Sequence, residues 1–282
     1  MIFGGSSTQS LAAALSEVLD DELALVDYER FPDGELKVNV GDVAPDRAIV
    51  VASTASSDAH VECLQLQDAA REAGATEVVT VLAYMGYARQ DEAFEAGDPV
   101  SARAVARAIS TGSDRVLTVN PHETAICEFF EPTATAVDGA GVLADPLPDD
   151  LDDPLFLAPD EGACALAETV RDAYGRGATD HFVKHRVSGD EVEVTPSDAA
   201  VADRDVVVVD DIVATGSTMS ESIAVLRDRD AASVSVATVH PLFAGNAVTK
   251  LRRAGVSRIV GTDTLERPQS VVSVAPVIAE HL

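Results

Sequence analysis

Tryptophan is absent from this sequence of 282 residues, and aromatic residues make up only 4% of it. Surfaces that stack the bases of single-stranded nucleic acids depend on aromatic side chains, so we do not expect such a surface here. Basic residues are also scarce, because 20 Lys and Arg stand against 48 Asp and Glu and give a net charge of −28. A chain that repels phosphate this strongly is poorly suited to sequence-independent binding of nucleic acids or anionic membranes.

Cysteines and long apolar runs are few as well. The three cysteines, Cys63, Cys127 and Cys164, are far apart in the sequence. An odd number at such spacing argues against a disulfide framework and against a CxxC metal site, so we expect small buried side chains. The start of the sequence lacks the basic region of a signal peptide, and no apolar run approaches the roughly 18 residues of a membrane span. We therefore expect a cytoplasmic protein.

Lysine is especially rare, since Lys37, Lys184 and Lys250 are the only ones and the other cations are arginines. Aspartate outnumbers glutamate. A dense carboxylate surface repels itself at ordinary ionic strength and is tolerated best when concentrated salt screens the charges. The composition therefore predicts a protein from an organism that accumulates salt.

The length fits two domains of about 150 residues each, and a hydrophobic share of 46% is typical of a globular protein. Strands are predicted at 48–52, 77–84, 115–119, 155–158, 182–186, 191–195, 206–209, 233–239 and 258–261, and helices at 58–73, 101–110, 163–174, 217–229 and 247–254. Ser57 or Asp58 should cap the first of these helices, and Gly74 should end it. The alternation indicates an α/β fold, with parallel sheets flanked by helices.

A domain boundary is predicted at Asp145–Pro154, which reads DPLPDDLDDP and has no periodicity. It divides the chain into domains 1–144 and 145–282. Val119–His122, which reads VNPH, resembles Val239–Leu242, which reads VHPL. This echo is a weak sign that the two halves are similar.

The segment with the clearest chemistry is Val206–Thr218, which reads VVVVDDIVATGST. It predicts a buried strand that ends in Asp210 and Asp211, followed by a glycine-containing loop that opens a helix. Ligands of open α/β sheets bind at the carboxyl ends of strands. The N–H groups of such a loop can hold a phosphate, and the two carboxylates can accept hydrogen bonds from vicinal hydroxyls or face a divalent cation. The segment therefore suits a ribose phosphate.

Two segments of the N-terminal half are less specific when each is taken alone. Phe31–Glu35, FPDGE, reads as a turn between strands, and Tyr87–Asp91, YARQD, leads into a loop. Arg89 offers a planar fork for a phosphate or a stacking plane for a base, and Gln90 could contact a purine edge. A hairpin turn and a solvated loop are the simpler interpretations.

Three more segments follow or end predicted strands. His122 in NPHE and Asp160 in APDEG lie where an imidazole or a carboxylate can reach a cation or a phosphate. Lys184 and Arg186 in KHR could together neutralise charge on a transferring phosphoryl group. A structural histidine and a basic edge strand are the simpler interpretations.

Together these six segments resemble those of the ribose-phosphate pyrophosphokinases, also called phosphoribosyl pyrophosphate synthetases, in order and approximate spacing from Met1 to about Val277. The loop segment by itself is similar to the phosphoribosyl pyrophosphate motif of the type I phosphoribosyltransferase fold. The resemblance, to an archaeal and halophilic type, implies two tandem domains of that fold. ATP would lie on the N-terminal side and ribose 5-phosphate on the C-terminal side, with the active site between the domains and at a subunit contact.

The resemblance also implies a role for each candidate residue. ATP would be bound by Asp33, Gly34, Glu35, Arg89 and Gln90, the first three reaching in from a neighbouring subunit. Ribose 5-phosphate would be bound by Arg186, Asp210, Asp211, Ala214, Thr215, Gly216, Ser217 and Thr218. The Mg²⁺ sites would involve His122 and Asp160, and the catalytic cations would be Lys184 and Arg186.

The implied reaction transfers the β,γ-diphosphoryl group of Mg-ATP to the anomeric hydroxyl of D-ribose 5-phosphate. The products would be AMP and 5-phospho-α-D-ribose 1-diphosphate, for nucleotide biosynthesis. Such a transfer needs positioning and charge neutralisation more than covalent help. The implied assembly is a homo-oligomer, at least a dimer, with no nucleic-acid or membrane partner.

The sequence departs from the family's pattern at several positions. Asn120 stands where the family usually has Asp, and in the loop Ala214 replaces an acid and Ser217 replaces a glycine. Ala163 and Ala165 replace a glycine and an arginine. The cations and carboxylates named above are all retained, so we expect an active enzyme.

Two other functions share the phosphate-loop segment. A phosphoribosyltransferase that consumes phosphoribosyl pyrophosphate needs no adenine site, so FPDGE and ARQ argue against it. A regulatory subunit or ligand sensor without catalysis would be expected to lose cations such as Lys184, which this chain retains. Gly139–Ala144 matches G-x-G-x-x-A but lacks a well-formed βαβ unit after it, and no lysine follows a glycine as in a Walker motif.

Overall fold

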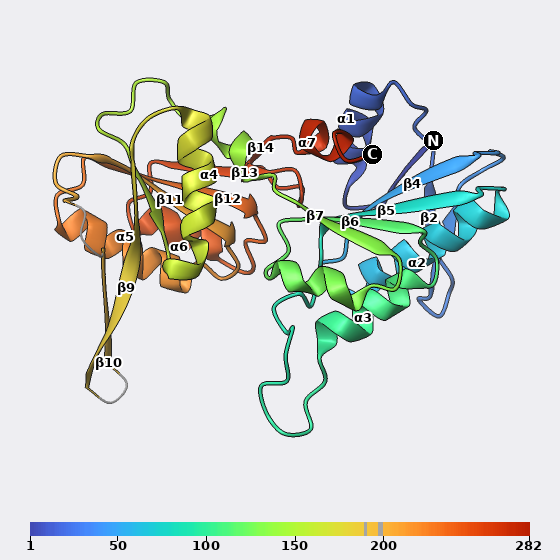
Figure 1. Ribbon diagram of the computed structural model, residues 1–282, viewed down its shortest axis with the longest axis horizontal. Coiled ribbons are helices and arrows are strands. Elements are labelled where there is room, and N and C mark those ends of the chain that lie inside the picture. The colour runs from blue at the N-terminus through green and yellow to red at the C-terminus, as the bar shows by residue number, and fades with distance from the viewer. Residues whose placement is uncertain (189–190, 197–199) are drawn as a thin grey trace. The chain divides into compact units, whose positions relative to one another are not determined.

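The computed structural model describes the backbone of residues 1–188, 191–196 and 200–282, and the side chains of residues 1–183 and 200–282. It consists of two compact units. The first unit comprises Met1–Gly139, Asp263–Glu266 and Ser273–Leu282, and the second comprises Ala140–Thr262 and Arg267–Val272. Both are built from parallel strands and helices, which confirms the predicted α/β class (Figure 1).

A parallel five-stranded sheet forms the centre of the first unit. Its spatial order is β1 (Ile2–Gly4), β4 (Arg47–Ser53), β5 (Glu77–Tyr84), β6 (Arg115–Val119) and β7 (Thr133–Val137). The three middle strands are almost wholly buried, as their runs of Val, Ile, Leu and Ala predict. Because the strands are parallel, the loops at their carboxyl ends all leave from one edge of the sheet.

Helices cover both faces of this sheet, with α2 and α3 on one face and α1 packed against α7 on the other (Figure 1). The helical segments of the first unit are α1 (Gln9–Leu19), α2 (Ser57–Glu72), α3 (Ser101–Ser110), η1 (Thr124–Phe129) and α7 (Ala275–Ala279). A separate antiparallel hairpin, β2 (Asp27–Arg30) and β3 (Leu36–Asn39), is attached to α2. Gln65 of α2 makes the attachment, since it accepts from the Val38 N–H at 3.1 Å and donates to the Leu36 carbonyl at 2.9 Å.

The start of α2 differs from the prediction by one or two residues. Its N-cap is Ser56, whose hydroxyl accepts a hydrogen bond from the Ala59 N–H at 3.2 Å, and not Ser57 or Asp58. All three residue types can cap a helix, but only Ser56 has the extended backbone that this position requires. At the other end Gly74, with φ of +106°, follows the last helical turn as predicted.

A seven-stranded sheet forms the centre of the second unit. Its spatial order is β10 (Glu191–Pro196), β9 (Ala178–Ser188), β8 (Leu155–Ala158), β11 (Asp205–Ile212), β12 (Ser233–His240), β13 (Arg258–Thr262) and β14 (Ser270–Val272). The strands are parallel except for β10, which pairs with β9 as a long antiparallel ribbon that extends beyond the helices (Figure 1). The helical segments are η2 (Ala140–Ala144), η3 (Glu161–Ala163), α4 (Cys164–Tyr174), α5 (Ser217–Asp228) and α6 (Ala247–Arg253).

The five strands of the first sheet follow the same order as β8, β11, β12, β13 and β14 of the second, so β4 corresponds to β11 and β5 corresponds to β12. Val119 ends β6, whereas Val239 lies in β12, and these two strands occupy different places in their sheets. The sequence echo therefore does not mark equivalent positions, although the similarity of the two halves is present in their topology. Four residues are too few to carry that information.

The C-terminal residues return to the first unit, since Ser273–Leu282 belong to it and not to the second. The division into domains 1–144 and 145–282 stays a prediction from sequence. Cys63 is fully buried as expected, whereas Cys127 and Cys164 are only partly buried, and all three are free thiols. In the part of the chain that the structure describes, every helix is too short or too polar to traverse a bilayer.

Candidate active site

The loop that follows β11 connects two carboxylates to the start of α5. Asp210 and Asp211 lie just before the last residue of the strand, and the backbone then passes through Val213 to the helix. The loop after the neighbouring strand β12 fastens it, because the N–H groups of Phe243 and Ala244 donate to the carbonyls of Val213 and Ala214, each at 2.9 Å. The strand, loop and helix that the sequence predicts for this segment are all present.

Gly216 is the N-cap residue of α5 and adopts a left-handed backbone, with φ of +69°. It has no side chain that could accept from the N–H groups of the first helical turn, and these groups have no carbonyl partner within the helix. Thr215, Ser217 and Thr218 are exposed beside them. Backbone N–H groups and hydroxyls at a helix N-terminus are the donors that bind phosphate.

Asp210 lies in an unfavourable electrostatic environment. Burial raises the pKa of its carboxyl well above the ordinary value, and the carboxylates of Asp211 and Asp160 raise it further. Asp160 follows β8, the strand next to β11, which explains why it acts on Asp210. A bound cation or the hydroxyls of a sugar would relieve this repulsion.

These three carboxylates have the ligand chemistry of a magnesium site. Within the described residues, no three His, Cys, Asp or Glu side chains converge closely enough to hold a metal by themselves. Mg²⁺ does not require such a cage, because it keeps several waters and is held by one or two carboxylates together with substrate phosphates. Asp160 fits that description as a carboxylate ligand, and the neighbouring Asp210 and Asp211 can face either the cation or the hydroxyls of a sugar. His122, the other predicted metal residue, is exposed after β6 of the first unit.

In the first unit the turn Phe31–Glu35 joins β2 to β3, as predicted. The Phe31 N–H donates to the Glu35 carbonyl at 2.9 Å, and the Gly34 N–H donates to the Phe31 carbonyl at 2.8 Å. Gly34 has φ of +94°, a conformation in which glycine is favoured. The exposed side chains of Asp33 and Glu35 stand at the tip of the hairpin.

The loop after β5 begins with a turn at Tyr87, whose φ is +63° and whose carbonyl accepts from the Gln90 N–H at 3.0 Å. The Gln90 side chain accepts a hydrogen bond from the Ser101 hydroxyl, at the first residue of α3. Arg89 is exposed. Gln90 thus anchors the loop while Arg89 remains accessible. The sequence did not indicate that these two residues have different roles.

The N-terminus of α2 brings these two segments together. Asp58 in its first turn pairs with Arg30 beside the hairpin turn, at 2.6 Å. Two residues further on, the ring of His60 packs against Tyr87, with centroids 5.4 Å apart. The predicted nucleotide segments therefore flank one helix end at the carboxyl edge of the sheet, and Arg30, Asp58 and His60 are supporting residues that the sequence analysis missed.

Asn120 replaces the acid usual at this position, and the structure gives a reason. Its amide nitrogen donates to the Asp138 carboxylate at 2.8 Å, while its oxygen accepts from the Gly139 N–H at 2.7 Å. An aspartate could make the second bond but would repel Asp138. Asn also tolerates the φ of +34° found here better than most residues.

The remaining predicted residues lie on β9, which begins before and ends after the predicted strand 182–186. In the ribbon, Lys184 is opposite Val194 and Arg186 is opposite Val192. The side chains of Lys184 and Arg186 lie outside the described residues.

Lys250 is a further residue that the sequence analysis did not connect with the site. It lies on α6, and its ammonium donates to the hydroxyl of Ser217, the first residue of α5, at 2.8 Å. Its only signal in the sequence is the rarity of lysine. The phosphate-type loop therefore has a cation attached to it by tertiary structure.

Known proteins resemble the chain over its whole length. Residues 1–112 match the model of the N-terminal domain of ribose phosphate pyrophosphokinase, and residues 145–274 match the phosphoribosyl transferase domain. A Halobacterium salinarum protein named ribose-phosphate pyrophosphokinase is 62% identical over 100% of both chains. The chain belongs to the ribose-phosphate pyrophosphokinase family.

Other ribose-phosphate pyrophosphokinases support this assignment. The relative from Methanosarcina mazei is 43% identical, covering 100% of this chain and 94% of its own. The crystal structure of phosphoribosylpyrophosphate synthetase from Mycobacterium smegmatis matches with a TM-score of 0.84 at 25% identity, covering 100% of this chain and 96% of the other. The predicted family, its phosphoribosyltransferase-type fold and its transferase class are thus confirmed, and the Halobacterium relative agrees with the predicted salt adaptation.

Proposed function

We propose that this ribose-phosphate pyrophosphokinase transfers the β,γ-diphosphoryl group of ATP to the anomeric hydroxyl of ribose 5-phosphate. The oxygen–phosphorus bond forms at the β-phosphorus, the bond from that phosphorus to the α-phosphate oxygen breaks, and AMP leaves. The observation that carries the proposal is the segment from Asp210 to Thr218. It joins two carboxylates to an uncapped helix N-terminus in a chain of this family.

Ribose 5-phosphate is bound at that segment. The 5-phosphate accepts hydrogen bonds from the backbone of Ala214 to Thr218 and from the exposed hydroxyls there. Asp210 and Asp211 accept hydrogen bonds from the ribose 2- and 3-hydroxyls, which relieves the repulsion that raises the pKa of Asp210.

ATP is bound by residues of the first unit. Arg89 and Gln90 contact the nucleotide from the loop after β5, and Asp33, Gly34 and Glu35 do so from the hairpin turn. Support comes from the helix α2, whose Asp58 and His60 contact both segments through Arg30 and Tyr87. Hairpin and loop are thereby held by one element.

Charge neutralisation is assigned to fixed cations and to Mg²⁺. Lys184 and Arg186 on β9 contact the transferring phosphates, and His122 and Asp160 lie at the metal sites. Mg²⁺ held there would supply positive charge to offset that of the phosphate oxygens. The protein's own contribution is to hold donor and acceptor in line and to surround the transferring group with positive charge.

An AMP-release assay tests the proposal. Purified protein in molar KCl with Mg²⁺, ATP and ribose 5-phosphate should form AMP and 5-phospho-α-D-ribose 1-diphosphate in equal amounts. Omission of ribose 5-phosphate should abolish AMP formation. A phosphoribosyltransferase or a sensor protein would release no AMP from these two substrates, so failure of the complete mixture would refute the proposal.

We also propose a homo-oligomer of at least two subunits, in which the hairpin turn of one subunit completes the ATP site of another. The half-exposed side chain of Phe31, at 49% of its maximum, supports a contact at this turn. Sedimentation in molar KCl should show no monomer at micromolar concentration. Mixing an inactive Asp33→Ala variant with an inactive Lys184→Ala variant should restore activity, because some sites then combine intact parts of both.

A further inference from the structure

Lys250 joins the phosphate-type loop from a neighbouring helix. Its Nζ lies 2.8 Å from the Ser217 hydroxyl oxygen, and the two helices that carry these residues pack against each other. At the start of α6, Ala247 lies close to Gly216, so that an added Cβ on the glycine would be 3.4 Å from the Ala247 carbonyl oxygen. The position of Lys250 beside the loop therefore follows from the packing of α6 on α5.

Lys250 has no acidic partner in the described part of the chain. Among the described residues it makes no ion pair with a carboxylate, although the chain carries 48 Asp and Glu. Lys37, by contrast, pairs with Glu29 at 3.3 Å. A partly buried ammonium that bonds only a neutral hydroxyl retains most of its attraction for an anion.

We propose that Lys250 binds the 5-phosphate of ribose 5-phosphate, and that the Ser217 hydroxyl holds its ammonium in position before the sugar phosphate arrives. The inference rests on the proposed function, because it takes the 5-phosphate to lie at the loop. It identifies the charged partner of that phosphate, which the backbone N–H groups and hydroxyls of the loop do not supply.

The need for such a partner comes from the carboxylates nearby. A phosphate dianion at this loop approaches Asp210 and Asp211, and Asp160 acts on the same carboxyl group of Asp210. A cation bonded to the loop offsets that repulsion. The cation also favours ribose 5-phosphate over uncharged ribose, since only the phosphorylated sugar is attracted to it.

Ser217, a departure from the family's glycine, fits this role. A hydroxyl oxygen can accept a hydrogen bond from an ammonium while its hydrogen is donated to a phosphate oxygen. Glycine at the same position could do neither. Ser217 and Lys250 therefore act as a pair.

The test compares Lys250→Met with Arg253→Met. Arg253 is exposed on the same helix, so the control removes the same charge without touching the loop. Binding of ribose 5-phosphate and of D-ribose is measured by calorimetry, and KM and kcat by AMP release, all in molar KCl. We expect Lys250→Met to weaken ribose 5-phosphate binding and raise its KM by about tenfold or more. D-ribose binding, the KM for ATP and kcat should stay unchanged, and Lys250→Arg should retain most of the affinity.

The outcomes separate this inference from the proposed function. If the unaltered protein binds no ribose 5-phosphate, the proposed function fails first. If it does bind and Lys250→Met binds equally well, the assignment of Lys250 is wrong. If the Lys250 and Arg253 variants lose the same affinity for ribose 5-phosphate, the effect comes from the overall charge of the protein, and the assignment of Lys250 is also wrong. A rise in both KM values with a lowered unfolding temperature would show a merely structural role.

Discussion

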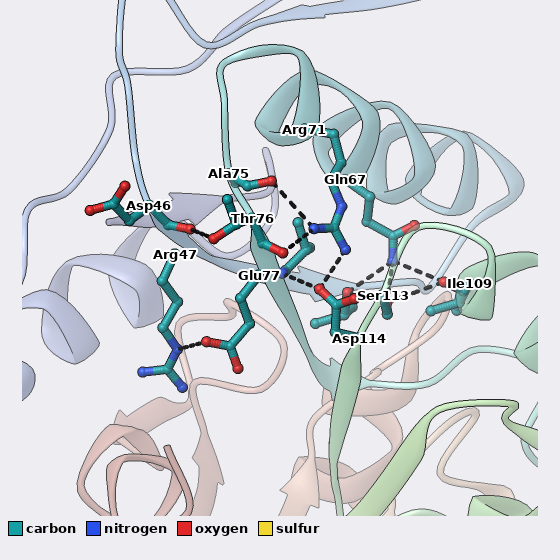
Figure 2. Close-up of polar contacts among 12 residues, drawn as sticks. Asp46, Arg47, Gln67, Arg71, Ala75, Thr76, Glu77, Ile109, Ser113 and Asp114 are labelled. Atoms are coloured by element: carbon teal, nitrogen blue, oxygen red, sulfur yellow. Dashed lines mark hydrogen bonds and ion pairs between the residues drawn. The ribbon is translucent and has the colours of Figure 1, made fainter.

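Arg47, the first residue of β4, donates from Nη2 to the carbonyl oxygen of Leu282 at 3.0 Å. Arg115, the first residue of β6, donates in the same way to the carbonyl of His281. Arg47 also pairs with Glu77 at the start of β5, at 3.2 Å (Figure 2). The last residues are therefore fastened to the amino ends of the first unit's strands, at the edge opposite the loops of the candidate site.

This attachment predicts that the C-terminal segment stabilises the first unit. Ile278 in α7 is fully buried. Ile278→Ala should lower the free energy of unfolding by about 2–5 kcal/mol, because it removes buried methylene groups and leaves a cavity. Denaturant unfolding in molar KCl measures this. Val271→Ala serves as the control, since Val271 is 56% exposed, and a similar loss in both variants would contradict the prediction.

A second prediction concerns the left-handed backbone at Gly216. Gly216→Ala should cost about 1–2 kcal/mol of stability, because side chains strain this conformation. It should also raise the KM for ribose 5-phosphate by distorting the loop. Gly41→Ala is a matched control, since Gly41 has φ of +73° with open space around it and lies in the other unit. The Gly41 variant should lose the same amount of stability but keep the KM for ribose 5-phosphate unchanged. If both variants raise this KM equally, the Gly216 loop is not part of the binding site.

A third prediction concerns pH and the network in Figure 2, where Asp114 meets the Arg71 guanidinium. Burial alone would raise the pKa of Asp114, but the hydrogen bond from the Val78 N–H at 2.7 Å and the contact with Arg71 outweigh it, so the pKa is lowered. A carboxyl with a lowered folded-state pKa stabilises the protein above its unfolded-state pKa, and this stability is lost as the pH falls through the folded-state value.

Asp114→Asn should therefore lower the free energy of unfolding by about 1 kcal/mol at pH 7, a modest amount because the side chain is partly exposed. The difference between the two proteins should shrink below about pH 4. Asp172→Asn is the control, since Asp172 is 71% exposed and pairs with its sequence neighbour Arg171. If the difference in unfolding free energy between the unaltered protein and Asp114→Asn stays constant with pH, the lowered pKa of Asp114 does not contribute to stability.

A fourth prediction concerns the catalytic cation proposed on β9. Lys184→Ala should lower kcat by about 10²–10³, the usual effect of removing one fixed electrostatic contact from a transition state. The unfolding temperature should be unchanged. His185→Ala, at the adjacent position, is the control and should retain most of the activity. Near-normal turnover of the Lys184 variant would remove this residue from the mechanism.

A fifth prediction follows from the net charge of −28. The unfolding temperature should rise steeply as KCl increases from about 0.1 M, where the Debye length is about 10 Å, to about 1 M, where it is about 3 Å. The same concentration series with a non-ionic osmolyte separates screening from general exclusion effects. Full stability at low salt would show that the carboxylate surface does not limit this protein.

The periodic parts of the fold were predictable from local sequence. Strands 77–84, 115–119 and 155–158 have the predicted bounds, because each is a short apolar run buried on both faces. Other elements were missed. β1 has three residues and α7 has five, lengths at which periodicity carries little signal, and both are held by contacts with distant segments. The 11-residue helix α1 and the strand β7 were missed as well, although α1 buries Leu11, Ala12 and Leu15.

The candidate site likewise has one part that was predictable from local sequence and one part that was not. The strand–loop–helix from Val206 to Thr218 could be read locally, because its strand pattern, carboxylates and helix-opening glycine are contiguous in the sequence. The link between Ser217 and Lys250 spans 33 residues and depends on how α6 packs on α5. Hydrophobic pattern and turn chemistry act over a few neighbours, whereas the pairing of side chains from different elements is set by packing. The sequence alone thus determined the fold class, the family and the loop, and only tertiary structure decided which cation stands beside that loop and where the last residues are bound.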